Sequence, residues 1–223
     1  MSFDTNAINP DRIYSLGDLE RTLGLQRWDV SRLLQKGVLD SLGTGVYVHR
    51  DFVPGLQDDL AIIALRCPEA VFNLYTSADL HEMNNRTLQG VYVGIPASQR
   101  APTVGGNFVT KILATRWSRE IDMTVGVEER IVRAVPIRLT DPERTVCDMW
   151  RYSMQNPGLR GNPKRIGDEE LSYALRKYLD VNDGATSALA EMMYRLDAPR
   201  STQDAFVQYL RAFTSGYEHN RVF

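Results

Sequence analysis

The fold is decided by residues 26–37, which read QRWDVSRLLQKG. An α-helix turns by about 100° per residue, so Val30, Leu33 and Leu34 would lie on one side of a helix formed by this stretch. That side must pack inward, because aliphatic side chains gain free energy when they leave water. Gly37 is expected to end the helix, since glycine readily adopts the left-handed conformation found just after helix C-termini.

The opposite side of the same helix carries an aromatic ring, cations and hydrogen-bonding side chains: Arg27, Trp28, Ser31, Arg32, Gln35 and Lys36. Arginine and lysine bind guanine edges or phosphates, glutamine can make two hydrogen bonds to adenine, and serine can contact either. We therefore predict that this helix reads DNA. The alternative is an ordinary solvated face on which the rest of the chain covers Trp28.

A second helix is predicted directly before this one. Ser15, with Asp18 three residues later, is typical of a helix N-terminal cap. Leucines follow at helical spacing, and Gly24 ends the helix. Two helices joined by a tight turn form the helix-turn-helix of many DNA-binding proteins.

A β-hairpin is predicted directly after the reading helix. Residues 38–42 and 46–49 are strand-like runs joined by a glycine-bracketed turn. Helix, turn, helix and hairpin in this order predict a winged helix-turn-helix. Thr44 at the hairpin tip and Arg50 at its base are expected to contact the DNA backbone, as Arg27 is.

The fold class is therefore expected to be α+β, with a DNA-binding domain over residues 1–54 and an α/β effector domain over residues 55–223. Helices are predicted over residues 59–66, from a cap at residues 76–79 to about Met83, and from a cap at Thr140 or Asp141 to about Ser153, with Glu143 as the capping-box partner. Strands are predicted at residues 70–75, 90–95, 108–114, 121–127 and 131–139. Residues 156–167 are expected to form a loop, and apolar stripes predict about three helices after it.

Composition narrows the class of protein. The chain is 43% hydrophobic and 24% charged, which is ordinary for a globular protein. It contains no run of eighteen apolar residues and no signal-peptide layout at its start, so we expect a cytoplasmic protein without a membrane partner. Cys67 and Cys147 are expected to be reduced core residues. A net charge of −2 excludes a general nucleic-acid coat but leaves room for a local DNA-binding surface.

Several segments resemble one protein family. Residues 14–16 with 24–25, residues 30–39 and residues 43–48 look like the N-terminal domain of AbiEi-type antitoxins. Further on, VPIRLTDPERTVCD (residues 135–148) resembles the motif in the C-terminal domain of the same family.

The resemblance implies the antitoxin of a type IV toxin–antitoxin system. Its winged domain would repress its own operon by binding inverted repeats in double-stranded DNA. Its second domain would neutralise a co-encoded nucleotidyltransferase toxin without a stable complex. Such a transcriptional repressor is not an enzyme and uses no cofactor or metal. One departure is Gln26, which stands where a serine or threonine usually caps, so the first turn of the reading helix is expected to be frayed or ordered only on DNA.

The segment Asp141-Pro142-Glu143-Arg144 has two interpretations. In the structural one, the acidic residues and proline start a helix and Arg144 pairs with Asp148 one turn later. In the functional one, the segment is an antitoxicity surface. We favour the structural interpretation.

Two other functions stay open. In a metal-dependent nuclease, Asp122 and Glu128 or Glu129 would share Mg²⁺, but Arg130 stands where a water-orienting lysine is expected. In a winged-helix transcription factor, the α/β domain would bind a small ligand. His81 follows an apolar helical pattern and is expected to be a core histidine, not a metal ligand.

Overall fold

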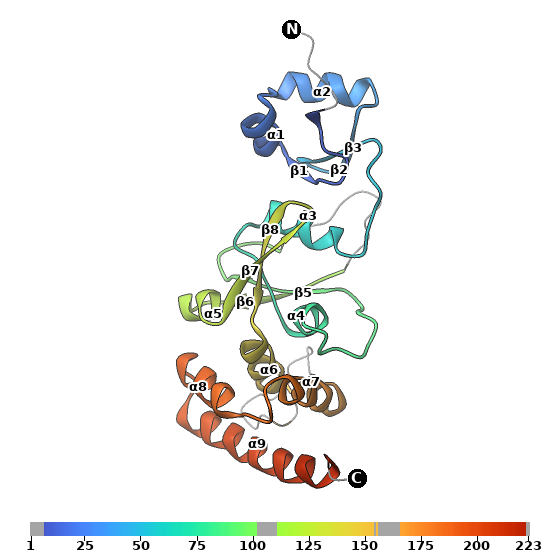
Figure 1. Ribbon diagram of the computed structural model, residues 1–223. Coiled ribbons are helices and arrows are strands. Elements are labelled where there is room, and N and C mark those ends of the chain that lie inside the picture. Colours follow the sequence, from blue (N-terminus) through green and yellow to red (C-terminus); the bar gives the residue numbers. More distant parts are fainter. Residues whose placement is uncertain (1–6, 102–110, 154, 156–165, 222–223) are drawn as a thin grey trace.

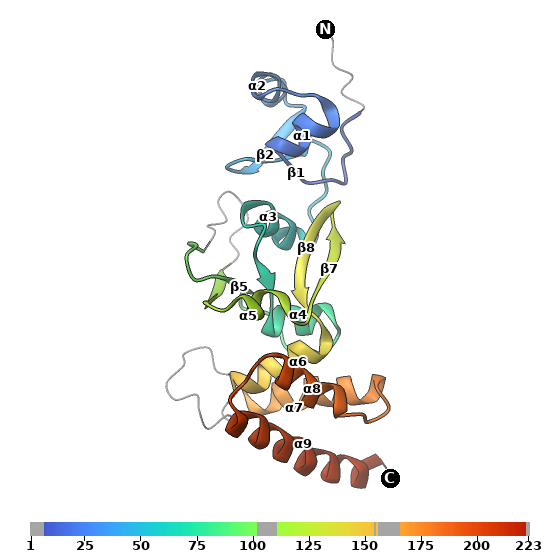
Figure 2. The same cartoon turned by 90° about the vertical axis from the view of Figure 1, so that its left-hand side faces the viewer.

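The computed structural model describes residues 7–101, 111–153, 155 and 166–221. They form a mixed α+β structure in three layers (Figure 1). A small N-terminal module, residues 7–54, lies at one end, a five-stranded sheet lies in the middle, and a group of helices lies at the other end. The view turned by 90° shows the same order (Figure 2).

The N-terminal module consists of β1 (Tyr14–Ser15), α1 (Leu16–Leu23), α2 (Arg27–Gln35), β2 (Leu39–Gly43) and β3 (Val46–His49). Its antiparallel sheet has the order β1-β3-β2. Both helices and the hairpin form where the sequence predicts them. Strand β1 was not predicted, because two residues are too few to show an alternating pattern.

The middle layer contains a mixed sheet with the strand order β6-β5-β4-β8-β7 and three helices. The elements of this layer, in chain order, are α3 (Asp58–Arg66), β4 (Val71–Phe72), α4 (Leu74–Leu80), β5 (Val91–Pro96), β6 (Ile112–Trp117), α5 (Glu120–Thr124), β7 (Val127–Val132) and β8 (Val135–Thr140). Strands β5 and β6 are parallel, as are β4 and β8. Helix α3 shares one apolar cluster with these strands.

Helix α4 begins earlier than predicted. Asn73, with an extended backbone, precedes its first residue, Leu74, and the carbonyl of Asn73 accepts the N–H of Thr76 at 3.1 Å. The expected cap at residues 76–79 is therefore wrong. The hydroxyl of Thr76 instead accepts the backbone N–H of Tyr92 at 2.8 Å, so it ties the helix to the neighbouring strand.

Two of the predicted strands are wrong. Most of the predicted strand 121–127 belongs to the short helix α5, in which the N–H of Val125 donates to the carbonyl of Ile121 at 3.0 Å. The predicted strand 131–139 is interrupted by a hairpin turn at Arg133 and Ala134, whose φ angles are 52° and 61°. Positive φ at both turn residues matches the twist of antiparallel strands, and it usually selects glycine or asparagine, so the turn gave no sequence signal.

The third layer contains α6 (Pro142–Arg151), α7 (Asp168–Val181), α8 (Ser187–Arg195) and α9 (Arg200–Arg221). Their predicted apolar stripes are buried in a common cluster around Trp150. The predicted strand residues 108–110 and loop residues 156–165 lie outside the described part of the chain.

The start of α6 confirms the N-cap but corrects one detail. The Asp141 carboxylate accepts the N–H of Arg144 at 2.7 Å, as an N-cap residue does. Glu143 is one position too early to be the capping-box partner. Its carboxylate instead accepts the hydroxyl of Tyr178 from α7 at 3.0 Å.

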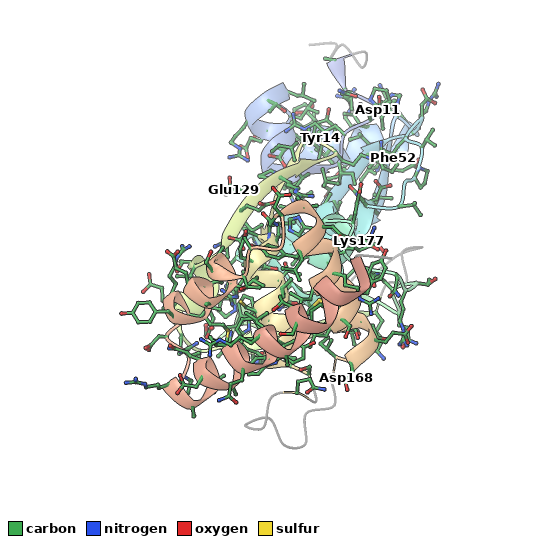
Figure 3. All side chains as sticks on the ribbon, turned by 60° about the horizontal axis from the view of Figure 1, so that its bottom comes forward. Asp11, Tyr14, Phe52, Glu129, Asp168 and Lys177 are labelled. Carbon is green, nitrogen blue, oxygen red and sulfur yellow. The ribbon has the colours of Figure 1, made fainter. Side chains whose placement is uncertain are left out.

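The N-terminal module contacts the middle layer through the β7–β8 hairpin. The carbonyl of Arg133 accepts the N–H of Ile13 at 3.3 Å. Its guanidinium donates to Asp58 at 2.7 Å and to the carbonyl of Val53 at 2.9 Å, and it lies 5.0 Å from the centre of the Phe52 ring. Figure 3 shows Phe52 in the N-terminal module near the end of the strand that carries Glu129. Arg133 thus contacts both modules, and Ile13, Val46 and Val48 of the N-terminal module also belong to the apolar cluster of α3 and the sheet.

Cys67 and Cys147 are free and buried, as expected for core cysteines. Burial raises the pKa of both thiols, most strongly for Cys147. Among the described residues, no helix combines the length and apolar composition that crossing a membrane requires.

Candidate nucleic-acid interface

Helix α2 lies at the end of the molecule remote from α9 (Figure 1). Val30 and Leu33 are buried and Leu34 is half-buried, so the aliphatic side of the helix packs into the module as predicted. Helix α1, against which it packs, starts with a complete capping box, in which Ser15 and Asp18 each accept the other's backbone N–H.

The first turn of α2 has a cap that the sequence analysis missed. The Asp29 carboxylate accepts the backbone N–H of Gln26 at 3.0 Å, and the Gln26 carbonyl accepts the N–H groups of Asp29 and Val30. Asp29 therefore orders the turn from its third position, as an acidic residue does in a capping box. The spacing of Gln26 and Asp29 was the available signal, and the turn is helical without DNA.

All six residues predicted for the outward face of α2 are exposed: Arg27, Trp28, Ser31, Arg32, Gln35 and Lys36. Trp28 is 60% exposed, which contradicts the alternative in which the rest of the chain covers it. We call this set the outward face of α2. It presents a large aromatic ring to the solvent, although such a ring would gain free energy by burial.

The described part of the chain offers the cations of this face no acidic partner. Within the described residues, no ion pair involves Arg27, Arg32 or Lys36. The guanidinium of Arg32 lies 5.8 Å from the centre of the Trp28 ring. The hydroxyl of Ser31 donates to the carbonyl of Arg27 at 3.1 Å. The positive charge of the face is thus available to an external anion.

The β2–β3 hairpin presents Thr44 at an exposed tip, as predicted. The glycines on either side, Gly43 and Gly45, have φ angles of 139° and 77°, a conformation that residues with a side chain rarely adopt. The tip can therefore approach a phosphate closely through its backbone and the threonine hydroxyl.

The base of the hairpin is less available for an anion than α2. Arg50 is exposed, but its Nε lies 3.7 Å from the Asp51 carboxylate. The Nδ1 atom of His49 accepts the N–H of Asp51 at 3.2 Å. Asp51 therefore offsets part of the positive charge that the sequence placed at this position.

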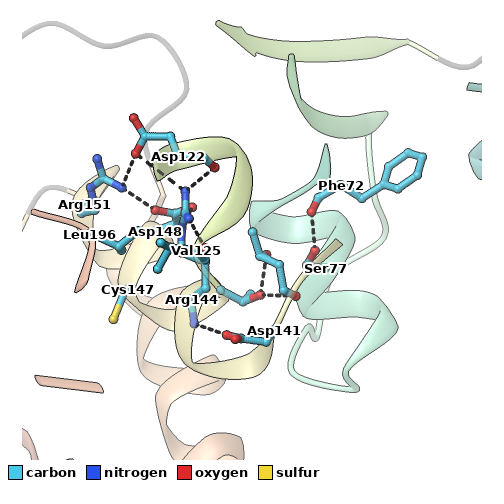
Figure 4. Close-up of polar contacts among 12 residues, drawn as sticks. Phe72, Ser77, Asp122, Val125, Asp141, Arg144, Cys147, Asp148, Arg151 and Leu196 are labelled. Carbon is cyan, nitrogen blue, oxygen red and sulfur yellow. Dashed lines mark hydrogen bonds and ion pairs between the residues drawn. The ribbon is translucent and has the colours of Figure 1, made fainter. Parts of the chain in front are cut away.

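A second cluster of arginines lies between α5 and α6 (Figure 4). We call it the arginine cluster, and it consists of Arg119, Asp122, Arg144, Asp148 and Arg151. Arg144 is fully buried and donates to Asp148 at 2.8 Å, which confirms the predicted pair. Arg151 donates to the same aspartate at 2.8 Å. The carboxylate of Asp122 lies 3.9 Å from the guanidinium of Arg144 and 3.6 Å from that of Arg151.

The arginine cluster also makes hydrogen bonds to backbone carbonyl groups. The Arg144 guanidinium donates to the carbonyls of Val125 at 2.6 Å and Asp122 at 3.1 Å. Burial by itself raises the pKa of the Asp122 carboxyl, but hydrogen bonds from Arg119 and the charges of the nearby arginines outweigh it and lower that pKa. Arg144 thus ties α6 to the turn after α5.

The carboxylates proposed for a nuclease are arranged differently from the expectation. Asp122 lies in helix α5 and not on a strand, and its carboxylate faces arginines. Glu128 pairs with Arg130 at 2.9 Å. In the described ranges, histidine, cysteine, aspartate and glutamate form no group of three or more that could hold a metal ion.

His81 has partners at both ring nitrogens. Its Nε2 lies 2.8 Å from the carbonyl of Thr140, and its Nδ1 lies 2.8 Å from the guanidinium of Arg130. Burial, together with the charge of Arg130, lowers the pKa of His81 although the Thr140 carbonyl opposes the shift. This is the satisfied histidine that the sequence predicts.

Comparison with known proteins adds little to this geometry. No protein-family model matches the chain, and a search of curated proteins gives no match. Among solved structures, the chain is similar to the RV2827C protein from Mycobacterium tuberculosis, at 14% sequence identity and a TM-score of 0.43 over 82% of this chain and 76% of that one. A likeness at this level says nothing about what the chain binds.

Proposed function

We propose that the chain is a DNA-binding regulator whose N-terminal module is a winged helix-turn-helix. Helix α2 would be the recognition helix and the β2–β3 hairpin the wing. The observation that carries the proposal is the outward face of α2. It is exposed, it is cationic without an acidic partner among the described residues, and it lies at the end of the molecule remote from α9.

The residues divide into two roles. Ser31, Arg32 and Gln35 would reach base edges in the major groove, as side chains of a recognition helix do. The DNA backbone would be contacted by Arg27, Thr44 and Arg50, as the sequence predicts, and Arg50 contributes least because Asp51 lies beside it. Lys36, which the sequence analysis grouped with the base-reading residues, follows the last residue of α2 and is assigned to the backbone as well. This division predicts sequence specificity from the middle of the helix and salt-dependent affinity from its ends and the wing.

We further propose that the chain is a cytoplasmic antitoxin of the AbiEi kind. It would repress its own operon and neutralise a co-encoded nucleotidyltransferase toxin through residues 55–223, without a stable complex with the toxin and without being an enzyme. The support is the resemblance of residues 135–148, which form β8 and the first turns of α6. A co-expression experiment tests this: the chain should restore growth to cells that express the adjacent nucleotidyltransferase, while a chain lacking residues 55–223 should not.

A gel-shift with the DNA upstream of the chain's own gene tests DNA binding. The wild-type chain should retard this DNA at concentrations that leave a shuffled duplex free. Arg32→Ala should weaken binding to the upstream DNA more than to the shuffled duplex, while Arg195→Ala should change neither, because Arg195 is exposed on α8 at the other end of the molecule. Absence of any retardation at low salt would refute the proposal.

A ligand-responsive transcription factor is a second candidate, and one cavity favours it. A cavity of about 490 Å³ lies between α3, α4 and residues 86–91, with Leu60, Thr76 and Lys111 among its lining. This volume is within the range of small-molecule sites, about 300–1,000 Å³. A thermal-shift screen of small metabolites tests it: a ligand that raises the melting temperature should lose this effect in Lys111→Ala, which replaces an exposed lining residue, and should change the affinity for DNA.

A further inference from the structure

The outward face of α2 contains a contact between two of its own side chains. The guanidinium carbon of Arg32 lies 5.8 Å from the centre of the Trp28 ring. A cation is attracted by the electrons of an aromatic ring within about 6 Å of the ring centre. The two residues are one helical turn apart, so their side chains are neighbours on the same face.

Packing does not explain why tryptophan stands at this position. Trp28 is 60% exposed and belongs to none of the apolar clusters of the described residues. Across the described ranges, the guanidinium of Arg32 has no carboxylate partner either. Among the described residues, the side-chain contact that the two share is the one with each other.

An aromatic ring against a guanidinium leaves the hydrogen-bond donors of the arginine free. Those N–H groups lie in the plane of the guanidinium and point outward from its edge. That edge is what makes two parallel hydrogen bonds to O6 and N7 of guanine in the major groove. An arginine already held by a ring also loses less side-chain freedom when it binds, so more of the hydrogen-bond energy remains as affinity.

We propose, building on the proposed DNA-binding function, that Arg32 reads a guanine and that Trp28 is the positioning residue that holds its guanidinium for this contact. Trp28 acts on base discrimination through Arg32. Arg27 and Lys36 supply charge to the same complex without selecting a base.

The guanine contact is tested with modified DNA. The full chain first selects a duplex from a random double-stranded library, and each guanine of that duplex is then replaced in turn by 7-deazaguanine, which lacks the N7 acceptor but still pairs with cytosine. At one guanine, or at its symmetry mate in an inverted repeat, the wild-type affinity should fall by about 5-fold or more. The same replacement should have little effect on Arg32→Ala.

The role of Trp28 is tested with a double-mutant cycle on the unmodified selected duplex. Trp28→Ala should lower the affinity by about 2- to 5-fold and should reduce the penalty of the 7-deazaguanine replacement. In the Arg32→Ala background, Trp28→Ala should have little further effect, because the side chain through which it acts is gone. Trp28→Phe should recover part of the loss, since it keeps a ring. Tyr194→Ala removes an aromatic side chain that is 73% exposed on α8 and should have no effect.

The outcomes separate this inference from the proposed function. If the losses from Trp28→Ala and Arg32→Ala multiply, or if no guanine replacement distinguishes wild type from Arg32→Ala, the inference is wrong while DNA binding stands. If the library yields no enriched duplex, the proposed function fails. Melting temperatures are measured for every variant, and if Trp28→Ala melts earlier, the cycle is repeated with Trp28→Phe, for which multiplicative losses again refute the inference.

Discussion

Two regions of this molecule gather arginines and use them in opposite ways. On the outward face of α2, Arg27 and Arg32 are exposed and face no carboxylate within the described residues. In the arginine cluster, Arg144 and Arg151 surround aspartates, and Arg144 is fully buried. A buried cation without a partner costs several kcal/mol, so it needs carboxylates and carbonyls, while water solvates an exposed one. The difference shows that the pairing of an arginine, and not its presence, indicates whether it serves the fold or a ligand.

The largest expected effect comes from the buried region. Arg144→Ala should lower the free energy of unfolding by about 3–5 kcal/mol, because it leaves Asp148 buried with one of its two arginine partners removed. Urea unfolding of the variant and of the control Arg195→Ala measures this. The affinity of the remaining folded protein for DNA should not change. Unchanged stability together with lost toxin neutralisation would reverse the comparison and make Arg144 part of an antitoxicity surface.

The next effect concerns the exposed region. Arg32→Ala should weaken binding to the selected duplex relative to a random one by about 1–3 kcal/mol, as expected for an arginine that reads a base. Its melting temperature should equal that of wild type, since the guanidinium takes part in no ion pair of the described residues. Fluorescence anisotropy with both duplexes measures the ratio of the two affinities. Equal losses on the two duplexes would make Arg32 a phosphate contact.

A smaller effect on stability is expected when the pH is lowered. The arginines hold the pKa of Asp122 below its ordinary value, so the folded protein binds this proton less readily than the unfolded chain does. The stabilisation is therefore present above about pH 4, the ordinary range of an unfolded aspartate, and is lost as the pH falls through the lowered pKa. Asp122→Asn should be less stable at neutral pH and should lose less stability on acidification. If the free energy of unfolding of Asp122→Asn falls with decreasing pH as steeply as that of wild type, Asp122 does not titrate in this way.

The smallest effect is expected for a phosphate contact. Lys36→Ala should reduce the slope of log affinity against log salt by about 0.9 and weaken binding to all duplexes alike. Lys177→Ala removes a lysine that is exposed on α7 and should leave the slope unchanged. A loss confined to the selected duplex would instead place Lys36 among the residues that read bases.

The parts of the fold that the sequence predicted well depend on local signals. Ser15 with Asp18 caps α1, Gly24 and Gly37 adopt positive φ after their helices, and the helical period places Val30 inside. These features involve residues within one or two turns of each other. The exposed residues of α2 follow from the same period, so the candidate site was largely predictable.

The parts that could not be predicted depend on contacts distant in sequence. The turn at Arg133 and Ala134 lacks the usual glycine or asparagine, and its arginine bonds to Asp58 and to the backbone of Val53 and Ile13. Helix α5 carries the apolar pattern of a strand, but Asp122 within it is held by arginines from neighbouring segments. Tertiary contacts of this kind override local propensity.

The burial of both cysteines has a practical consequence. A maleimide dye reacts with a thiolate, and burial both shields the thiols of Cys67 and Cys147 and raises their pKa. A thiol introduced by Thr44→Cys, at the exposed hairpin tip, should therefore be labelled long before either natural cysteine. A fluorophore could then be attached beside the expected DNA surface without first removing any residue from the core.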